Sequence, residues 1–160
     1  MRVALSMLFM LLPVVAFAQI KRTNPPTLST PTGYTHIVEV TGPAKTVYIS
    51  GQIAFDKDGK LVGAGDMKAQ AEQVFKNLEA ALTAAGATFK DVVKMNTYVT
   101  DMDKAPAVRE VRAKYMGTGL GADASRDPSP LPASTLVQVV HLARPELMLE
   151  IEVIAVVTAR

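Results

Sequence analysis

The sequence predicts an α+β fold in which two helices cover one face of a mixed, six-stranded sheet. Two segments repeat apolar residues at helical spacing, and several shorter segments alternate apolar and polar residues as strands do. Their order along the chain is βββαβαββ. Since each helix has a single apolar stripe, both can pack on one face of the sheet. The 160 residues and the 49% hydrophobic content suit one domain with a core.

The first 18 residues predict a cleavable secretory signal. Arg2 precedes an apolar run over residues 3–17, and Ala16-Phe17-Ala18 has the small-residue pattern of a cleavage site after Ala18. A membrane anchor is the alternative, but the run is short for a membrane span. We therefore expect a periplasmic or secreted protein, with an extended leader over residues 19–32 and one domain over residues 33–160.

Charge and cysteine content exclude several classes of function. Removal of residues 1–18 takes away one arginine, so the formal charge falls from +2 to +1 (16 basic minus 15 acidic residues). A nearly neutral chain lacks the excess of positive charge that binding to nucleic-acid phosphates requires. Without cysteine there is no disulfide, thiolate nucleophile or thiolate metal site. The two histidines, His36 and His141, lack acidic partners at ligand spacing, so no metal site is expected.

The first strands are expected as a meander. Residues 35–41 and 46–55 alternate as strands, and Asp58-Gly59 is typical of a hairpin turn that leads into a third strand. A further strand is expected over Asp91–Thr100, between the two helices.

Two helices are expected from their end signals as well as from their stripes. Asp66 is a typical N-cap, and Gly86 ends the first helix. Asp103 is the expected cap of the second helix. Arg109 and Arg112 lie off its apolar stripe, so both are expected in solvent.

The C-terminal third combines a long loop with two apolar runs. Gly117–Leu131 is rich in Gly, Pro, Ser and Asp, which is typical of a lid, a binding loop or a mobile segment. The runs Leu136–Leu142 and Leu147–Val157 flank Arg144-Pro145, which predicts a hairpin turn or bulge between two strands.

The last run places two carboxylates on one face of its strand. Leu149, Ile151 and Val153 alternate with Glu150 and Glu152. Because lone carboxylates are rarely buried, the second face must meet water, a cation or a wet cavity. The simplest interpretation is a solvated sheet face. Self-association that closes several sheets around a wet interior also fits, because other residues on that face are apolar.

Several motifs, taken in order, resemble the Rid (YjgF/RidA) family, whose older names include L-PSP endoribonucleases. They are Ser50-Gly51-Gln52-Ile53, the strand Asp91–Asp101, Pro132-Ala133 with Val137-Gln138-Val139, and Glu150-Ile151-Glu152-Val153-Ile154-Ala155-Val156. The resemblance covers about residues 30–157. It implies a chorismate-mutase-like fold and a homotrimer with a small-molecule site in each of three subunit clefts.

The resemblance also implies a chemistry that needs neither metal nor organic cofactor. RidA hydrolyses enamines and imines: an arginine binds the substrate carboxylate through two hydrogen bonds, and a glutamate positions the water that adds to the imine carbon. In this sequence Glu150 matches that catalytic glutamate. Tyr34 matches a tyrosine that lines the site, and Ser50 and Gly51 match the strand end that approaches the ligand.

Ser134 departs from the family pattern, because deaminating members have arginine at that position. Thr135 follows, and Leu136 replaces the usual cysteine. Serine offers one neutral hydrogen bond in place of a charged pair worth about 1.5–3 kcal/mol. We therefore predict an altered substrate specificity in which carboxylated imines bind poorly unless another arginine supplies the charge. The candidates are Arg109, Arg126 and Arg144.

Three functions remain open from the sequence. The first is a RidA-like hydrolase of an enamine, imine or related small molecule, with water positioned by Glu150. The second is a non-catalytic trimer that binds a small metabolite. The third, RNA cleavage, follows the older family name, but near-neutral charge and export both argue against it. No nucleic-acid partner and, after signal cleavage, no membrane association are expected.

Overall fold

The computed structural model describes residues 18–117 and 131–158. The expected signal sequence up to Phe17 lies outside the described residues. So does most of the Gly117–Leu131 loop, including Arg126.

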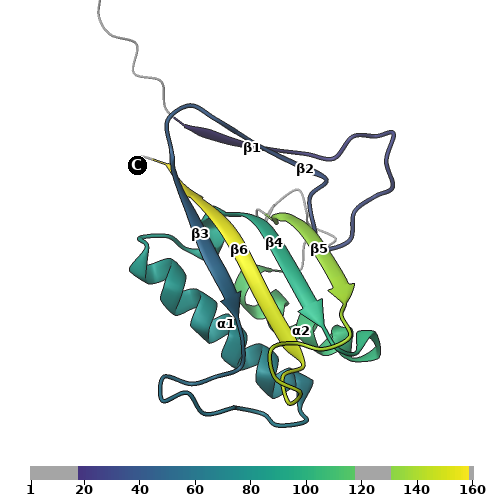
Figure 1. The fold of residues 1–160 in the computed structure, drawn as a ribbon. Helices are drawn as coiled ribbons and strands as arrows, with labels where there is room; N and C mark the ends of the chain where they lie inside the picture. The colour runs from purple at the N-terminus through teal and green to yellow at the C-terminus, as the bar shows by residue number, and fades with distance from the viewer. Residues whose placement is uncertain (1–17, 118–130, 159–160) are drawn as a thin grey trace, which may run out of the picture.

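In the described part of the chain, six strands and two α-helices follow one another in the expected order βββαβαββ (Figure 1). The elements are β1 (Gln19–Thr23), β2 (Ile37–Thr41), β3 (Lys45–Gln52), α1 (Met67–Ala84), β4 (Val92–Val99), α2 (Ala105–Met116), β5 (Ala133–Gln138) and β6 (Leu149–Val157), with 3₁₀ turns η1 (Phe89–Asp91) and η2 (Met102–Lys104).

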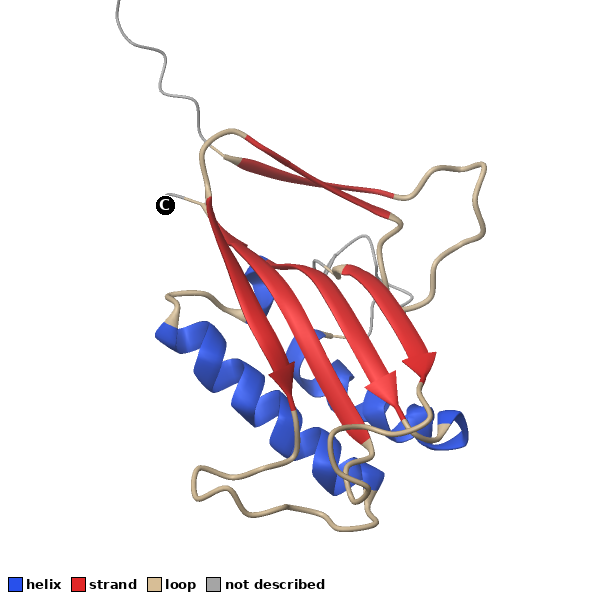
Figure 2. Ribbon diagram, viewed as in Figure 1, coloured by secondary structure: helices blue, strands red, loops and turns tan. Residues whose placement is uncertain are grey.

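The predicted α+β class is confirmed, with both helices on one face of a mixed sheet (Figure 2). This sheet has four strands in the order β3-β6-β4-β5. Its β4–β5 pair is parallel and the other two pairs are antiparallel. Strands β1 and β2 form a separate antiparallel pair. The six strands are therefore divided between two sheets, and the four-stranded sheet has one face without helices.

The beginning of the chain differs from the expected meander. The segment expected as an extended leader contains β1, which pairs with β2 from Gln19↔Thr41 to Thr23↔Ile37. The Asp58-Gly59 turn forms, but it leads only to an isolated bridge between Phe55 and Leu61. The Asp56 side chain accepts hydrogen bonds from the amides of Asp58 and Lys60. These local hydrogen bonds close the turn, so the turn does not require a pair of extended strands beside it.

The predicted hairpin at Arg144-Pro145 is wrong, because β5 and β6 are not neighbours. Strand β4 lies between them, parallel to β5 and antiparallel to β6. The β4-α2-β5 segment is a crossover unit, which joins parallel neighbouring strands through a helix. The connection over residues 139–148 then passes the end of β4, so β6 pairs on the far side of β4.

The helix ends agree with the sequence at α1 and differ at α2. The Asp66 side chain accepts hydrogen bonds from the amides of Lys68 and Ala69, and Gly86 follows the helix with a φ of 72°. Asp103 does not cap α2. Asp101 instead accepts from the Asp103 amide and begins η2, which continues into α2.

The core lies between the sheet and the helices, and among the described residues it contains one fully buried side-chain amide, which was not predicted from the sequence. Gln70 of α1 donates to the carbonyls of Gly63 and Glu146 at 3.2 and 2.9 Å and accepts from the Met148 amide at 2.9 Å. It therefore joins α1 to the loops before α1 and before β6, and so positions the start of β6.

Candidate functional site

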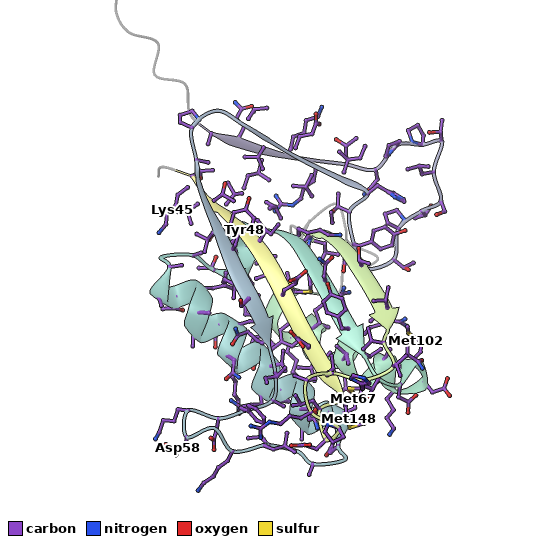
Figure 3. All side chains as sticks on the ribbon, in the orientation of Figure 1. Lys45, Tyr48, Asp58, Met67, Met102 and Met148 are labelled. Carbon is purple, nitrogen blue, oxygen red and sulfur yellow. The ribbon has the colours of Figure 1, made fainter. Side chains whose placement is uncertain are left out.

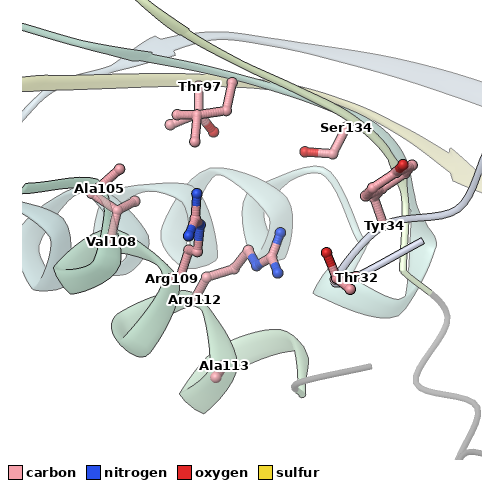
Figure 4. A pocket seen from close by; sticks show the side chains of 11 residues that line it. Thr32, Tyr34, Thr97, Ala105, Val108, Arg109, Arg112, Ala113 and Ser134 are labelled. Carbon is pink, nitrogen blue, oxygen red and sulfur yellow. The ribbon is translucent and has the colours of Figure 1, made fainter. Parts of the chain in front are cut away.

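A cavity of about 450 Å³ lies between α2 and the edge strand β5 (Figure 4). Its volume is within the range of about 300–1,000 Å³ that is usual for small-molecule sites. The lining residues are Thr32, Gly33, Tyr34, Thr97, Ala105, Val108, Arg109, Arg112, Ala113, Ser134 and Leu136.

The register of β5 decides which of its side chains face this cavity. Ser134 and Leu136 pair with Met95 and Thr97 of β4 and share the helix-covered face of the sheet. Thr135 lies on the opposite face, where its hydroxyl accepts a hydrogen bond from Lys94 at 2.7 Å. Alternation along the strand thus separates three adjacent residues that were predicted to share one site.

Tyr34 reaches the same cavity because the chain before β2 is tied to the start of β5. The Thr35 hydroxyl donates to the Leu131 carbonyl at 2.8 Å, and the Thr35 amide donates to the Pro132 carbonyl at 3.1 Å. These bonds hold residues 32–35 across from Ser134, so segments about 100 residues apart in the sequence form one wall.

Arg109 and Arg112 line the cavity, and the expectation that both lie in solvent is wrong for Arg112. They lie one turn apart on α2; Arg109 extends toward the strands, and Arg112 extends toward Thr32 and Tyr34 (Figure 4). Arg109 is exposed, whereas Arg112 is half-buried. Burial lowers the pKa of Arg112, and the neighbouring charge of Arg109 lowers it further. A guanidinium nevertheless remains charged at neutral pH.

Gly33 allows the Arg112 guanidinium to lie against the backbone of the cavity wall. Gly33 has a φ of +81°, and a Cβ built there would collide with Nη2 of Arg112. Both the backbone conformation and the close approach require glycine at this position.

A second group of predicted site residues lies on the open face of the sheet. Glu150 is half-buried beside Gly51, where a Cβ would collide with its carboxylate. Within residues 18–117 and 131–158, no hydrogen bond or ion pair involves the Glu150 side chain. Ser50 is exposed and borders a neighbouring hollow with Tyr48 and Lys94.

Glu152 lies on the same face as Glu150 but has partners. Its Oε1 accepts hydrogen bonds from Asn96 at 2.7 Å and from the Tyr98 hydroxyl at 3.1 Å. The hydrogen bond to Glu152, together with burial and the charges of Glu152 and Glu150, raises the pKa of Tyr98. Glu152 therefore holds the two β4 side chains in place, whereas Glu150 has no such partner among the described residues.

The structure thus brings Tyr34, Ser134 and Leu136 together in the cavity and places Gly51 and Glu150 elsewhere. Of the arginines considered as replacement cations, Arg109 lines the cavity, and the Arg144 guanidinium carbon lies 4.9 Å from the Phe55 ring centroid. Arg112 was not predicted as a site residue. The sequence did contain one signal for it: Arg112 follows Arg109 by three residues, and residues at this spacing lie on the same face of a helix.

Two further features concern only the described part of the chain. It holds no group of three histidine or carboxylate side chains that could bind a metal ion. Among its helices, none combines the length and apolar character needed to cross a membrane.

Comparison with known proteins places the fold and these residues in a family. Residues 27–157 match the family model described as endoribonuclease L-PSP. The chain belongs to the Rid (YjgF/RidA) family. A solved Rid family protein of unknown function, YyfB from Yersinia pestis, is 35% identical with a TM-score of 0.71, over 85% of this chain and 97% of that one. The structure of RidA from an Antarctic Psychrobacter is also 35% identical, with a TM-score of 0.57 over 84% and 96% of the two chains.

Relatives of this Rid protein include proteins named as deaminases. A 2-iminobutanoate/2-iminopropanoate deaminase of Dermatophagoides farinae is 32% identical over 124 residues, which are 78% of this chain and 85% of that protein. A RutC family protein of Pyrococcus horikoshii is 38% identical over 101 residues, 62% and 79% of the two chains. Some relatives of this Rid protein are therefore imine deaminases by name, whereas others carry only a family name.

Proposed function

We propose that this Rid protein is an exported hydrolase of an enamine, an imine or a related small molecule. The observation that carries the proposal is the Glu150 carboxylate, which lies beside Gly51 on an uncovered sheet face without a partner among the described residues. A half-buried carboxylate without a partner is unfavourable for stability and is typical of a functional site. The deaminase relative of Dermatophagoides farinae supports this class of reaction.

The proposed active cleft lies between two subunits of a homotrimer. Within one chain, Glu150 and the cavity with Ser134 lie on different faces of the sheet. In the proposed cleft, Glu150 of one subunit therefore lies beside the edge of the cavity of a second subunit. The open face supports such contact. It exposes 77% of Tyr48, which is labelled in Figure 3, and 39% of Val137. These exposed apolar side chains lie on the two edge strands of the face, which suits a surface that a second copy covers.

The proposed reaction replaces a carbon–nitrogen bond with a carbon–oxygen bond. Glu150 accepts a proton from a water molecule as the water oxygen adds to the imine carbon. The proton then passes to nitrogen, which gives a carbinolamine. The hydroxyl proton of this intermediate also moves to nitrogen, the carbon–nitrogen bond breaks, and ammonia leaves as the carbonyl forms. An enamine first takes a proton on carbon and loses one from nitrogen, which gives the imine. Water and the imine supply every atom of the products, so no cofactor takes part.

Ser134 is proposed to alter specificity within this reaction. It lies in the cavity beside Tyr34 and Leu136, where its hydroxyl offers a neutral hydrogen bond. The ligand group nearest Ser134 is therefore expected to differ from the one that an arginine at this position would select.

The proposal is tested by following ammonia release from imines that an amino-acid oxidase generates in the same solution. We expect the purified protein to accelerate release above the spontaneous rate, with a molecular mass in solution of three chains. Ligand-induced thermal stabilisation with no acceleration over a range of imines would instead support the alternative, a trimeric metabolite-binding protein. A monomeric mass would contradict the shared cleft.

A further inference from the structure

We propose that Arg109 and Arg112 bind the carboxylate group of a short-chain ligand in the cavity between α2 and β5. This assigns the anion-binding role to α2 rather than to position 134 of β5. The inference rests on the proposed function for the reaction that the ligand undergoes. The binding site itself is argued from the contacts of the described residues.

Charge pairing on α2 separates these two arginines from the other charged residues of the helix. Glu110 pairs with Lys68 of α1 at 2.6 Å, and Lys114 pairs with Glu72 of α1. Over residues 18–117 and 131–158, no hydrogen bond or ion pair connects the guanidinium of Arg109 or Arg112 to another residue. The charges that face α1 are thus compensated by α1, whereas those that face the cavity are not compensated by any described residue.

Burial makes the uncompensated charge of Arg112 costly. Its Nε atom is buried and has no hydrogen-bond partner in the described part of the chain, and the neighbouring Arg109 carries the same charge. Two adjacent like charges with a buried donor destabilise the empty protein. A bound anion would remove the repulsion and satisfy the donor, so the arrangement favours an anionic ligand.

The position of Arg112 is maintained by the cavity wall. Gly33 lacks the Cβ that would collide with Nη2 of Arg112, and the bonds made by Thr35 hold this segment against β5. The guanidinium is therefore positioned by the fold before a ligand arrives, which lowers the cost of binding.

The remaining lining identifies a carboxylate on a short hydrocarbon chain. A guanidinium offers two parallel donors that match a carboxylate, and the hydroxyls of Tyr34 and Ser134 add neutral donors. Most of the remaining wall is apolar and consists of Ala105, Val108, Ala113 and Leu136, with Thr32 and Thr97 beside them. Neither arginine lies in the first turn of α2, so the proposed anion contacts come from these side chains and not from the helix N-terminus.

This assignment changes the prediction made from Ser134. Loss of an arginine from β5 predicts weak binding of carboxylated imines if nothing else changes. With two guanidiniums supplied by α2, such ligands keep a charged partner, approached from the helix side of the cavity. Specificity then changes in the placement of the carboxylate rather than in its acceptance.

The test is a comparison of butyrate, succinate, butyramide and inorganic phosphate binding to the full protein, by calorimetry and ligand-detected NMR at fixed ionic strength. We expect butyrate to bind at least about tenfold more tightly than butyramide, and Arg112→Gln to weaken butyrate binding at least about tenfold. Arg109→Gln should have a smaller effect because Arg109 is exposed. Arg144→Gln is the matched control and should leave butyrate binding unchanged.

Folding of each variant is checked by thermal melting. If Arg112→Gln does not fold, Arg112→Lys takes its place. Lys keeps the charge but loses the paired donors, so butyrate binding should still weaken. Equal binding of butyrate and butyramide, or unchanged butyrate binding in the Arg112 variants, would overturn the proposal. Tighter binding of phosphate than of butyrate would overturn its carboxylate class.

The outcome is separable from that of the proposed hydrolysis. Butyrate binding that depends on Arg112 in a protein with no turnover of any imine would retain the carboxylate site and reject the hydrolase. Turnover of imines together with butyrate binding that is indifferent to Arg112 would do the opposite.

Discussion

The cavity between α2 and β5 and the open face of the sheet have opposite charges and are built in different ways. The cavity carries two guanidiniums, neutral hydroxyls and an apolar wall. The open face carries Glu150 and Glu152 on β6 with polar side chains from β4. In each region one charged residue is held close to a glycine, Arg112 by Gly33 and Glu150 by Gly51.

In both regions, charged residues that have a partner can be distinguished from charged residues that have none among the described residues, and we assign a functional role to the second kind. Glu152 and Glu150 are two residues apart on the same strand face, yet only Glu152 has hydrogen-bond donors among the described residues. On α2, Glu110 and Lys114 pair with α1, and Arg109 and Arg112 do not. A paired charge contributes to the fold, whereas an unpaired and partly buried charge destabilises the empty protein and favours a ligand.

The largest expected effect is on turnover when Glu150 is changed. Glu150→Gln removes the proposed proton acceptor and should lower the rate of ammonia release about 100- to 10,000-fold, because general-base catalysis typically contributes that much. Glu152→Gln is the matched control on the same face and should retain most turnover. Steady-state rates with imines generated in situ measure both. Equal losses in the two variants would remove the distinction between the two glutamates.

Next in size is the effect of Gln70→Leu on stability. The substitution leaves two carbonyls and the Met148 amide without partners in the core, which should lower the free energy of unfolding by about 2–4 kcal/mol. Urea denaturation measures the change. Because Gln70 lies in neither region, the folded variant should retain its preference for butyrate over butyramide. A loss of that preference would indicate that the cavity depends on how β6 begins.

A smaller effect is expected when the space beside Arg112 is filled. Gly33→Ala places a methyl group against the guanidinium and should weaken butyrate binding several-fold, without changing the behaviour of Glu150. Its positive φ adds strain of about 1 kcal/mol. Gly59→Ala is the control, because Gly59 has a φ of +73° but open space around it. Calorimetry should then show weaker butyrate binding only in the Gly33 variant.

The smallest effect concerns the alkaline stability of the open face. The pKa of Tyr98 is raised in the folded protein, so the folded state holds this proton more tightly than the unfolded state. That stability is present below about pH 10, the ordinary pKa of tyrosine, and declines as pH rises through the raised value. Tyr98→Phe should therefore show a shallower loss of stability above pH 10 than the wild type, by denaturation at several pH values.

Much of the fold could be predicted because local patterns specify it. The cap at Asp66, the end signal at Gly86 and the alternation of β6 depend on residues close together in the chain. The neighbour of each strand was not predictable in this way. Both β5 and β6 pair with β4, and the proline between them is as compatible with a long connection as with a hairpin.

In the candidate site, too, some residues could be predicted from the sequence and others could not. Tyr34, Ser134 and Leu136 were predicted and do share the cavity, whereas Glu150, predicted with them, lies on another face of the same chain. Arg112 was assigned to solvent because a helical stripe shows only which side is most apolar. The sequence does not show that the adjacent side of α2 lies along β5.

By itself, the sequence determined the α+β class, the order of elements, the membership of the Rid family and the two carboxylates on one face of β6. Each of these depends on short-range periodicity or on motifs that are read along the chain. Only the tertiary structure decided that β4 separates β5 from β6, that Gln70 joins three backbone segments, and that Arg109 and Arg112 face a cavity and not a charged partner among the described residues. These features depend on packing between segments many residues apart, where burial and charge compensation are set by neighbours that local sequence does not specify.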